Sequence, residues 1–406
     1  MRSKKIWINL SITNLCLVAA LGVLMRSKII FDLPWIDYNR LVDTHGHFAF
    51  AGWATLVLIT LMVYELPGAL YSKSKYQVLL GAIFICSWLT LFTSPFEKFK
   101  NLTEYVSFIY ILVTYIFFGV FTRDILKTTA NKTVKLLSIS ALLYQVLSSA
   151  GAIMLACLFA MKSLNAILYR DALFGYLHMQ YNGFFTLAVF ALIFNKVVPV
   201  KGNEKAMKSF HWFGILLSLS IIPSMFLTFL WHKITPVFHI ISAIGGVMLL
   251  SSFISFVFAA PFLLKEFKMV KPAIRYMIIL SITAFLIKIL MQSLTFVDSI
   301  NVLVFGNRPM IMGFLHLIFL GFVTLFVMTY FSQRGYLDVK SKFTRFALMV
   351  FTIAILINET LLMLQGLGNM FLTSSPLFPW YLWGAGILLL AGTILIAGAR
   401  IRTKQI

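Results

Sequence analysis

The sequence is poor in charged residues. Only 12% of its 406 residues are Asp, Glu, Lys or Arg, whereas a soluble domain carries about 25%. Hydrophobic residues make up 60% of the chain, and its mean hydropathy is +0.93. These values exclude a soluble enzyme, a disordered chain and an extracellular disulfide scaffold, and they indicate a protein whose solvent is the lipid bilayer.

Cysteine is scarce as well. The three cysteines, Cys16, Cys86 and Cys157, each lie within an apolar run, and no two of them form a Cys-x-x-Cys pair. Covalent attachment of c-type haem, iron–sulfur clusters and thiolate zinc sites are therefore unsupported. We expect all three thiols to be buried packing residues.

Acidic residues are the scarcer of the two charged classes. The chain has 13 Asp and Glu against 34 Lys and Arg, which gives a formal net charge of +21. In a soluble protein this excess would suggest a nucleic-acid partner. In a membrane protein, however, Lys and Arg gather in cytoplasmic loops. The positions of the basic residues relative to the spans therefore decide between the two interpretations.

The apolar segments predict an all-α, polytopic membrane protein that forms a single twelve-span domain over residues 1–406. A span needs about 20 residues, and the predicted limits are 6–24, 44–64, 77–95, 105–122, 136–160, 172–194, 210–230, 236–262, 274–296, 310–331, 344–364 and 380–399. The first segment follows Met-Arg-Ser-Lys-Lys but has no small-residue cleavage site, so we expect a retained helix. No internal repeat is evident by inspection.

The basic residues predict the orientation of these spans. The two termini and the even-numbered loops hold 24 Lys and Arg, the odd-numbered loops hold 9, and one, Lys288, lies inside a span. The positive-inside rule then places both termini in the cytoplasm. The net charge thus reflects membrane topology, and we expect a lipid bilayer and no nucleic acid as partner.

Six of the seven histidines fall at one depth. With both termini inside, they lie in the outer third of the membrane, on five different spans: His45, His47, His178, His232, His239 and His316. Polar groups in a bilayer are costly and normally face a bundle interior, and neutral imidazole is the commonest metal ligand. We therefore predict a metal or haem site near the outer face. The alternative for each histidine is a hydrogen bond between helices.

The second span carries two of these histidines. His45 and His47 are two residues apart, or about 200° around a helix, so they cannot easily share a metal. We expect the deeper His47 to be a ligand while His45 faces a loop or lipid headgroups. Met312 lies one turn before His316 and is a candidate soft axial ligand, although a methionine more often serves in packing.

Two ionisable residues lie deep within spans. Lys288 is in the middle of the ninth span, and Glu359 is in the outer half of the eleventh. Intramembrane ionisable residues are functional candidates by default. Both could relay protons, and both could equally be structural partners or side chains that extend to the membrane surface.

Twelve spans, cytoplasmic termini and histidines on the second, sixth, seventh and tenth spans resemble subunit I of the haem–copper oxidases. This superfamily includes oxygen-reducing terminal oxidases and nitric oxide reductases. The resemblance implies that His47 or His45, together with His316, holds haem, and that His178 and His232 hold copper. Lys288 resembles a proton-channel lysine of the family, although it lies on the ninth span here.

The chain departs from the family pattern at several positions. Where the family has two adjacent histidines, this chain has only His232. Where the family has His-x-His in the tenth span, this chain has only His316. Tyr181 lies one residue before the position of the family's cross-linked tyrosine, which is Asn182 here. The chain also resembles the NnrS-type proteins, twelve-span haem- and copper-binding proteins of nitric oxide metabolism, in its length and in its second-span Asp-Thr-His-Gly-His-Phe.

The leading hypothesis is a haem protein of the bacterial plasma membrane, with or without copper, that binds or reduces nitric oxide or oxygen. Its electrons would come from a cytochrome or a quinol. One alternative is a proton-coupled secondary transporter, in which Lys288, Glu359 and the histidines carry protons. Another is a gas-responsive haem protein without turnover, so whether the chain is an oxidoreductase stays open.

Overall fold

The computed structural model describes residues 2–66, 70, 74–197, 204–268 and 271–403. All regular secondary structure in these ranges is helical. Twelve continuous helical stretches are long and apolar enough to cross a membrane. Each of them coincides with one of the predicted apolar segments, so the prediction of an all-α, twelve-span protein is confirmed.

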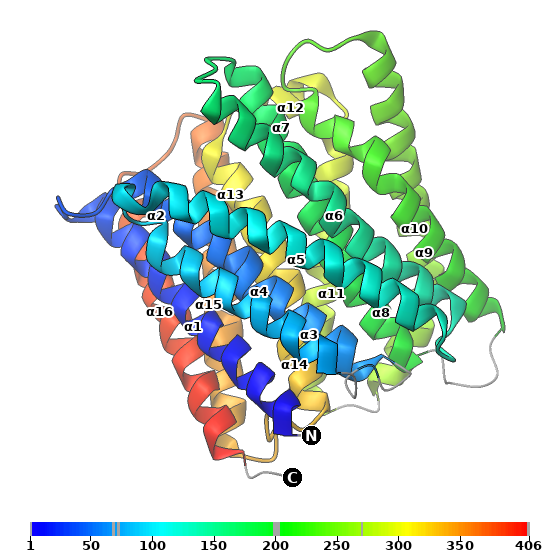
Figure 1. The fold of residues 1–406 in the computed structure, drawn as a ribbon. Helices are drawn as coiled ribbons and strands as arrows, with labels where there is room; N and C mark the ends of the chain where they lie inside the picture. The colour runs from blue at the N-terminus through cyan, green and yellow to red at the C-terminus, as the bar shows by residue number, and fades with distance from the viewer. Residues whose placement is uncertain (1, 67–69, 71–73, 198–203, 269–270, 404–406) are drawn as a thin grey trace.

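Figure 1 shows how the helical segments are arranged in the bundle. Those labelled α are α-helices, η1, η4 and η6 are π-helices, and η3 and η5 are 3₁₀-helices. Their bounds are α1 (Arg2–Ile30), α2 (Tyr38–His47), η1 (Phe48–Thr55), α3 (Leu56–Glu65), α4 (Ser74–Thr93), η3 (Glu97–Phe99), α5 (Lys100–Leu126), α6 (Lys132–Ala160), α7 (Ala166–His178), η4 (Met179–Phe185), α8 (Thr186–Val197), α9 (Glu204–Met225), η5 (Phe226–Phe229), α10 (Pro236–Lys268), α11 (Pro272–Leu294), α12 (Asp298–Phe305), α13 (Arg308–His316), η6 (Leu317–Thr324), α14 (Leu325–Gln333), α15 (Lys342–Met370) and α16 (Phe378–Arg402).

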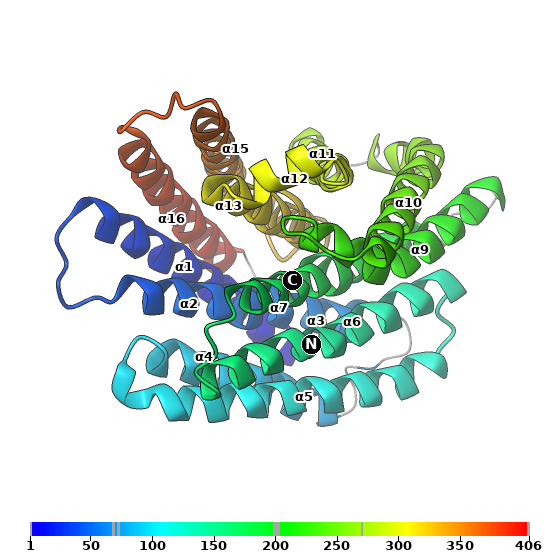
Figure 2. The same ribbon diagram turned by 90° about the horizontal axis from the view of Figure 1, so that it is seen from above.

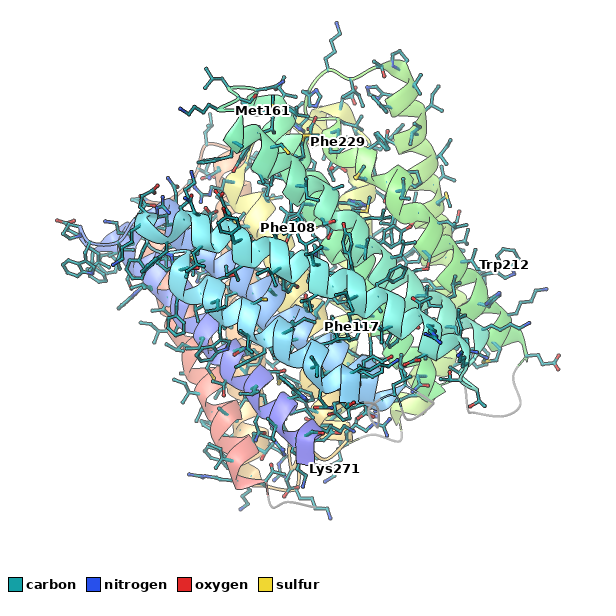
Figure 3. All side chains as sticks on the ribbon, in the orientation of Figure 1. Phe108, Phe117, Met161, Trp212, Phe229 and Lys271 are labelled. Atoms are coloured by element: carbon teal, nitrogen blue, oxygen red, sulfur yellow. The ribbon has the colours of Figure 1, made fainter. Side chains whose placement is uncertain are left out.

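The two ends of the chain lie at the same end of the bundle. α1 begins and α16 ends there (Figure 1), as an even number of crossings requires. Lys271 lies at this end too (Figure 3), which fits its assignment to the same side as the termini. Which end of the bundle faces the cytoplasm stays a prediction.

The outer surface is apolar, as lipid contact requires. Phe108 and Trp212 are half or more exposed on the outside of the bundle (Figure 3). Cys86 is buried and Cys16 is half-buried, but Cys157 is exposed. The expectation of a buried thiol is therefore wrong for Cys157, because this part of α6 faces away from the bundle, where lipid can cover an apolar side chain.

The second, sixth and tenth spans are the most buried of the twelve. Figure 2 shows α7, the start of the sixth span, with other helices on all sides. Each of the three spans is an α-helix that continues through a π-helix into a second α-helix: α2–η1–α3, α7–η4–α8 and α13–η6–α14. A π-helix closes wider turns than an α-helix and is frequent at functional sites, so these three spans are where a site is expected.

Candidate functional site

A cavity of about 870 Å³ lies within the bundle. Side chains from α1, α2, α4, α5, α6, α7, α13, α15 and α16 line it. Its volume is in the range of about 300–1,000 Å³ that is typical of pockets for ligands and cofactors. His45, His47 and His316 all contribute to its wall, so the structure brings these three predicted ligands to one cavity.

His45 and His316 line this cavity from different spans. They come from α2 and α13 and lie close enough to interact electrostatically. The Nδ1 atom of His316 donates a hydrogen bond to the Met312 carbonyl at 2.7 Å, so its Nε2 atom carries the lone pair that a metal needs. The Nδ1 atom of His45 is buried without a hydrogen-bond partner among the described residues. Two imidazoles so placed can serve as the axial ligands of a haem iron.

The absence of a side chain at Gly22 leaves space for the His45 ring. A Cβ atom at Gly22 of α1 would lie 3.4 Å from Cε1 of His45, so α1 passes the imidazole closely. Met312 also lines the cavity, one turn before His316. Its carbonyl orients the His316 ring, and this is a contribution that the sequence alone did not indicate.

Two arginines line the same cavity, Arg26 and Arg308. Arg26 donates to the Leu382 carbonyl and, at 2.7 Å, to Oδ1 of Asn358. Asn358 in turn donates to Oε1 of Glu359 at 3.0 Å, and Oε2 of Glu359 is buried without a hydrogen-bond partner within the described residues. Glu359 thus lies behind Arg26 rather than on the cavity wall, and its role in proton relay stays a prediction.

The histidines predicted to hold copper are not brought together. His178 is fully buried, where its Nε2 donates to the Ile221 carbonyl at 2.9 Å and its Nδ1 accepts from Asn182 at 3.1 Å. Both ring nitrogens of His232 face acceptors as well, the nearer being Asp171 at 2.8 Å. His239 is half-buried near the start of α10. Within the described part of the chain, no three His, Cys, Asp or Glu side chains converge so that they could hold a metal ion.

Lys288 and Tyr181 lie near His178 and do not line the cavity. Lys288 is 1% exposed, and its Nζ atom has no hydrogen-bond partner among the residues described. It is close enough to His178 to interact electrostatically. The Tyr181 ring lies 6.0 Å from the His178 ring and 5.7 Å from that of Phe314. The predicted catalytic roles of Lys288 and Tyr181 stay predictions.

An internal repeat is present that inspection of the sequence missed. The pattern His-x-x-aromatic-x-Gly-aromatic-x-Thr-Leu occurs three times, at 47–56, 178–187 and 316–325. Each histidine ends an α-helix, and the π-helices η1, η4 and η6 directly follow. The three copies share only these few positions, so the sequence similarity between them is weak. The similarity is easy to recognise once the three π-helices are aligned with one another. His47, His178 and His316 are therefore equivalent positions.

The three copies meet in the middle of the bundle. Phe50, Phe185 and Phe319, one from each copy, have ring centroids 4.5–5.5 Å apart. Trp53 of the first copy also donates to Thr324 of the third at 3.1 Å. Aromatic packing of this kind fixes the three spans relative to one another, and with them the histidine that each span carries.

Comparison with known proteins supports this architecture at the level of the fold. No family model matches the sequence, and no curated protein matches it. The structure is similar to a haem–copper terminal oxidase solved as a dimer by cryo-electron microscopy, with a TM-score of 0.71 and 16% sequence identity over 100% of this chain and 84% of the other. The chain therefore has the fold of a haem–copper oxidase subunit I, as its span plan predicted.

Proposed function

We propose that this chain is an integral-membrane haem protein in which His45 and His316 are the axial ligands of one haem. The observation that carries the proposal is the pair of imidazoles in one cavity, from the second and tenth spans, each with a nitrogen that no described residue engages. The haem–copper oxidase fold adds support, because the cavity is formed by spans of that fold.

The surrounding residues suit this cofactor. A bound haem would supply one-electron redox chemistry. The hydrogen bond from His316 to the Met312 carbonyl fixes the ring orientation and makes the imidazole a better donor to iron. Arg26 and Arg308 on the cavity wall can neutralise the two carboxylates of the cofactor. The mostly apolar wall keeps water away from the metal.

Copper fits less well. The predicted ligands His178 and His232 use both of their ring nitrogens in hydrogen bonds, and His239 does not join them. Copper is therefore not part of the proposed site. The wider role that we propose is binding or reduction of a diatomic gas, oxygen or nitric oxide, with electrons from a cytochrome or a quinol of the bacterial plasma membrane.

The test is spectroscopy on purified protein. We expect a haem with the sharp ferrous bands of a low-spin iron, and we expect His45→Ala and His316→Ala each to lose those bands. His239→Ala is the matched control, because it removes another outer-third histidine that does not line the cavity. Retention of the low-spin bands in both cavity variants would overturn the assignment.

Measurements on the same purified protein also distinguish the two alternative functions. A colourless protein that takes up a solute together with protons in liposomes would favour the proton-coupled transporter. A haem protein that shows no steady-state consumption of oxygen or nitric oxide under a reductant would favour a gas-responsive protein without turnover.

A further inference from the structure

Lys288 is a buried amine that has no counter-charge in the part of the chain that the structure describes. It lies in α11, its side chain is 1% exposed, and its Nζ atom has no hydrogen-bond partner among the described residues. None of the ion pairs between described residues includes it. An ammonium group that leaves water without a partner is costly, and ionisable residues inside a membrane are normally paired or functional.

A second unpartnered donor lies one turn along the same helix. Gln292 follows Lys288 by four residues, so the two side chains share a face of α11. Gln292 is 5% exposed, and neither its Nε2 nor its Oε1 atom has a hydrogen-bond partner within the described ranges. If the amide oxygen turned toward Lys288, the Nε2 atom would stay unpaired and the ammonium charge would stay uncompensated. Both groups are completed by a species that carries negative charge and accepts two hydrogen bonds.

The surroundings of Lys288 are apolar. α11 lies between α10 and the tenth span, to which α13 belongs (Figure 2). The ring centroid of Phe285 is 5.8 Å from the Nζ atom, and Phe285 packs on Phe190 and Phe322 with ring centroids 4.7 and 5.2 Å apart. All three rings are buried. Because these rings exclude water from one side of the ammonium group, its attraction for an anion is strong.

The same surroundings disfavour a metal cation. Lys288 is close enough to His178 to interact with it electrostatically. Both ring nitrogens of His178 are engaged, by the Ile221 carbonyl and by Asn182. A copper ion at His178 would be repelled by the ammonium group and would find no free imidazole nitrogen. The position at which the family resemblance implies copper is therefore better suited to an anion.

The enclosure of the two donors limits the size of the ion. Neither Lys288 nor Gln292 lines the 870 Å³ cavity or the adjoining pocket of about 410 Å³, which His47 and Arg40 line. The carboxylates of a large cofactor would therefore lie elsewhere. A small inorganic anion is the class of ligand that suits an enclosed position of this kind.

Polar groups continue from Gln292 past the end of the span. The Oγ1 atom of Thr295 donates to the Gln292 carbonyl at 2.7 Å, and Asn301 of α12 donates to the Thr295 carbonyl at 2.8 Å. The Oδ1 atom of Asn301 is buried without a hydrogen-bond partner in the described part of the chain. An ion from the aqueous phase would enter past this polar turn, and it would not have to cross the packed rings.

We propose that Lys288 and Gln292 bind a small monovalent anion, of the class of chloride or nitrite, inside the ninth span. The Nζ atom of Lys288 supplies the counter-charge, and the Nε2 atom of Gln292 donates a hydrogen bond. A resident anion keeps Lys288 charged, whereas a proton relay requires the amine to release its proton. The proposal goes beyond the proposed function, because it uses no residue of the haem site and does not depend on haem.

The experiment measures anion binding to the purified full-length protein. The protein is dialysed into sodium gluconate, whose anion is too large for the site, and sodium chloride replaces it at constant ionic strength. Equilibrium dialysis with radioactive chloride should find one bound ion per chain. The melting temperature should rise saturably, by roughly 5 °C at a hundredfold excess over the Kd. Bromide and nitrite should reproduce the rise, and the larger, divalent sulfate should not.

Variants assign the ion to its ligands. Lys288→Met should bind no chloride and should melt at the same temperature in chloride and in gluconate. Gln292→Leu keeps the charge and should weaken chloride binding about tenfold, because it removes a hydrogen bond to an ion. Lys288→Arg should retain saturable binding. The matched control is Lys233→Met, which removes an exposed lysine outside the spans and should bind chloride as wild type does.

Each outcome decides the proposal. Absence of saturable chloride binding to wild type overturns it, and so does an equal effect of chloride and gluconate on the melting temperature. Chloride binding that survives in Lys288→Met also overturns it, because the ion would then lie elsewhere. The wild-type measurement decides even where a variant fails to fold. Haem content is a separate readout on the same samples, so failure of the haem assignment leaves this result unaffected.

Discussion

The His316 side chain has its direction set by its own helix. Its Nδ1 atom is bonded to the Met312 carbonyl four residues earlier, and this hydrogen bond leaves one nitrogen for a metal. The His45 imidazole is hydrogen-bonded to the Val18 backbone of another helix, and its Nδ1 is buried without a partner among the described residues. Because the bond that orients His316 comes from its own helix, His316 is the better site for a conservative change of ligand.

We expect His316→Met to keep a haem at the proposed site and to raise its reduction potential. A thioether is a weaker donor to ferric iron than imidazole, and histidine–methionine ligation is associated with higher potentials. Of the span of about 0.8 V that axial ligands cover, we expect a rise of roughly 0.1 V. A redox titration followed at the α band measures it. An unchanged potential would show that His316 is not bound to the iron.

At the scale of the element, each copy of the repeat places a glycine within its π-helix. Gly183 in η4 lies against α6, where an added Cβ atom would be 2.4 Å from Cβ of Tyr144. Gly321 in η6 is tight as well, with Cβ of Ala284 on α11 at 3.1 Å. In the second and third copies the glycine thus lies where a neighbouring helix comes close, whereas Gly52 of the first copy faces the ring of Phe48 in its own π-helix at 2.7 Å.

The change Gly183→Ala should destabilise the protein by about 1–3 kcal/mol, because it overpacks a rigid contact between η4 and α6. The matched control is Gly119→Ala on α5, where an added Cβ atom meets nothing within 4 Å. There the exchange should be neutral or stabilise by about 0.5–1 kcal/mol, since glycine is a poor helix former. Thermal unfolding of the detergent-solubilised variants distinguishes the two. An equal change in melting temperature for the two variants would show that the contact at Gly183 is not tight.

The helical elements were predictable from the sequence, and the direction of their side chains was not. Length and hydropathy are local properties, so each of the twelve spans could be located. Which of His45 and His47 faces His316 depends on how α2 is rotated about its axis relative to α13. The spacing of residues along the sequence does not determine that rotation. The sequence favoured His47 as the ligand, whereas the proposed haem site uses His45, which interacts electrostatically with His316. His47 lines the same cavity and an adjoining pocket.

At the scale of the whole molecule, ion pairs connect the ends of three spans. Glu65 at the end of α3 is 4% exposed and lies 2.5 Å from Lys4 of α1 and 2.7 Å from Arg334, which follows α14. It also accepts hydrogen bonds from Tyr330 and Tyr336 at 3.1 and 3.0 Å. These contacts raise the pKa of Tyr336, a residue outside the spans, because burial and the Glu65 carboxylate both disfavour a phenolate.

The end that carries Glu65 is predicted to face the cytoplasm, and labelling can test this. In a variant with Cys16, Cys86 and Cys157 replaced by Ala, a membrane-impermeant maleimide should label Ser163→Cys in intact cells. It should label Lys340→Cys only after lysis. Both positions are exposed and lie on opposite sides of the predicted topology, so the reverse pattern would invert the orientation.

The two histidines of α2 have a consequence for how this end of the second span can adjust. Two peptide units of one helix separate His45 from His47, and both side chains line the same cavity. A rotation of α2 that repositions one imidazole must therefore reposition the other. Neither ring can accommodate a bound group by a helix movement that leaves its neighbour in place.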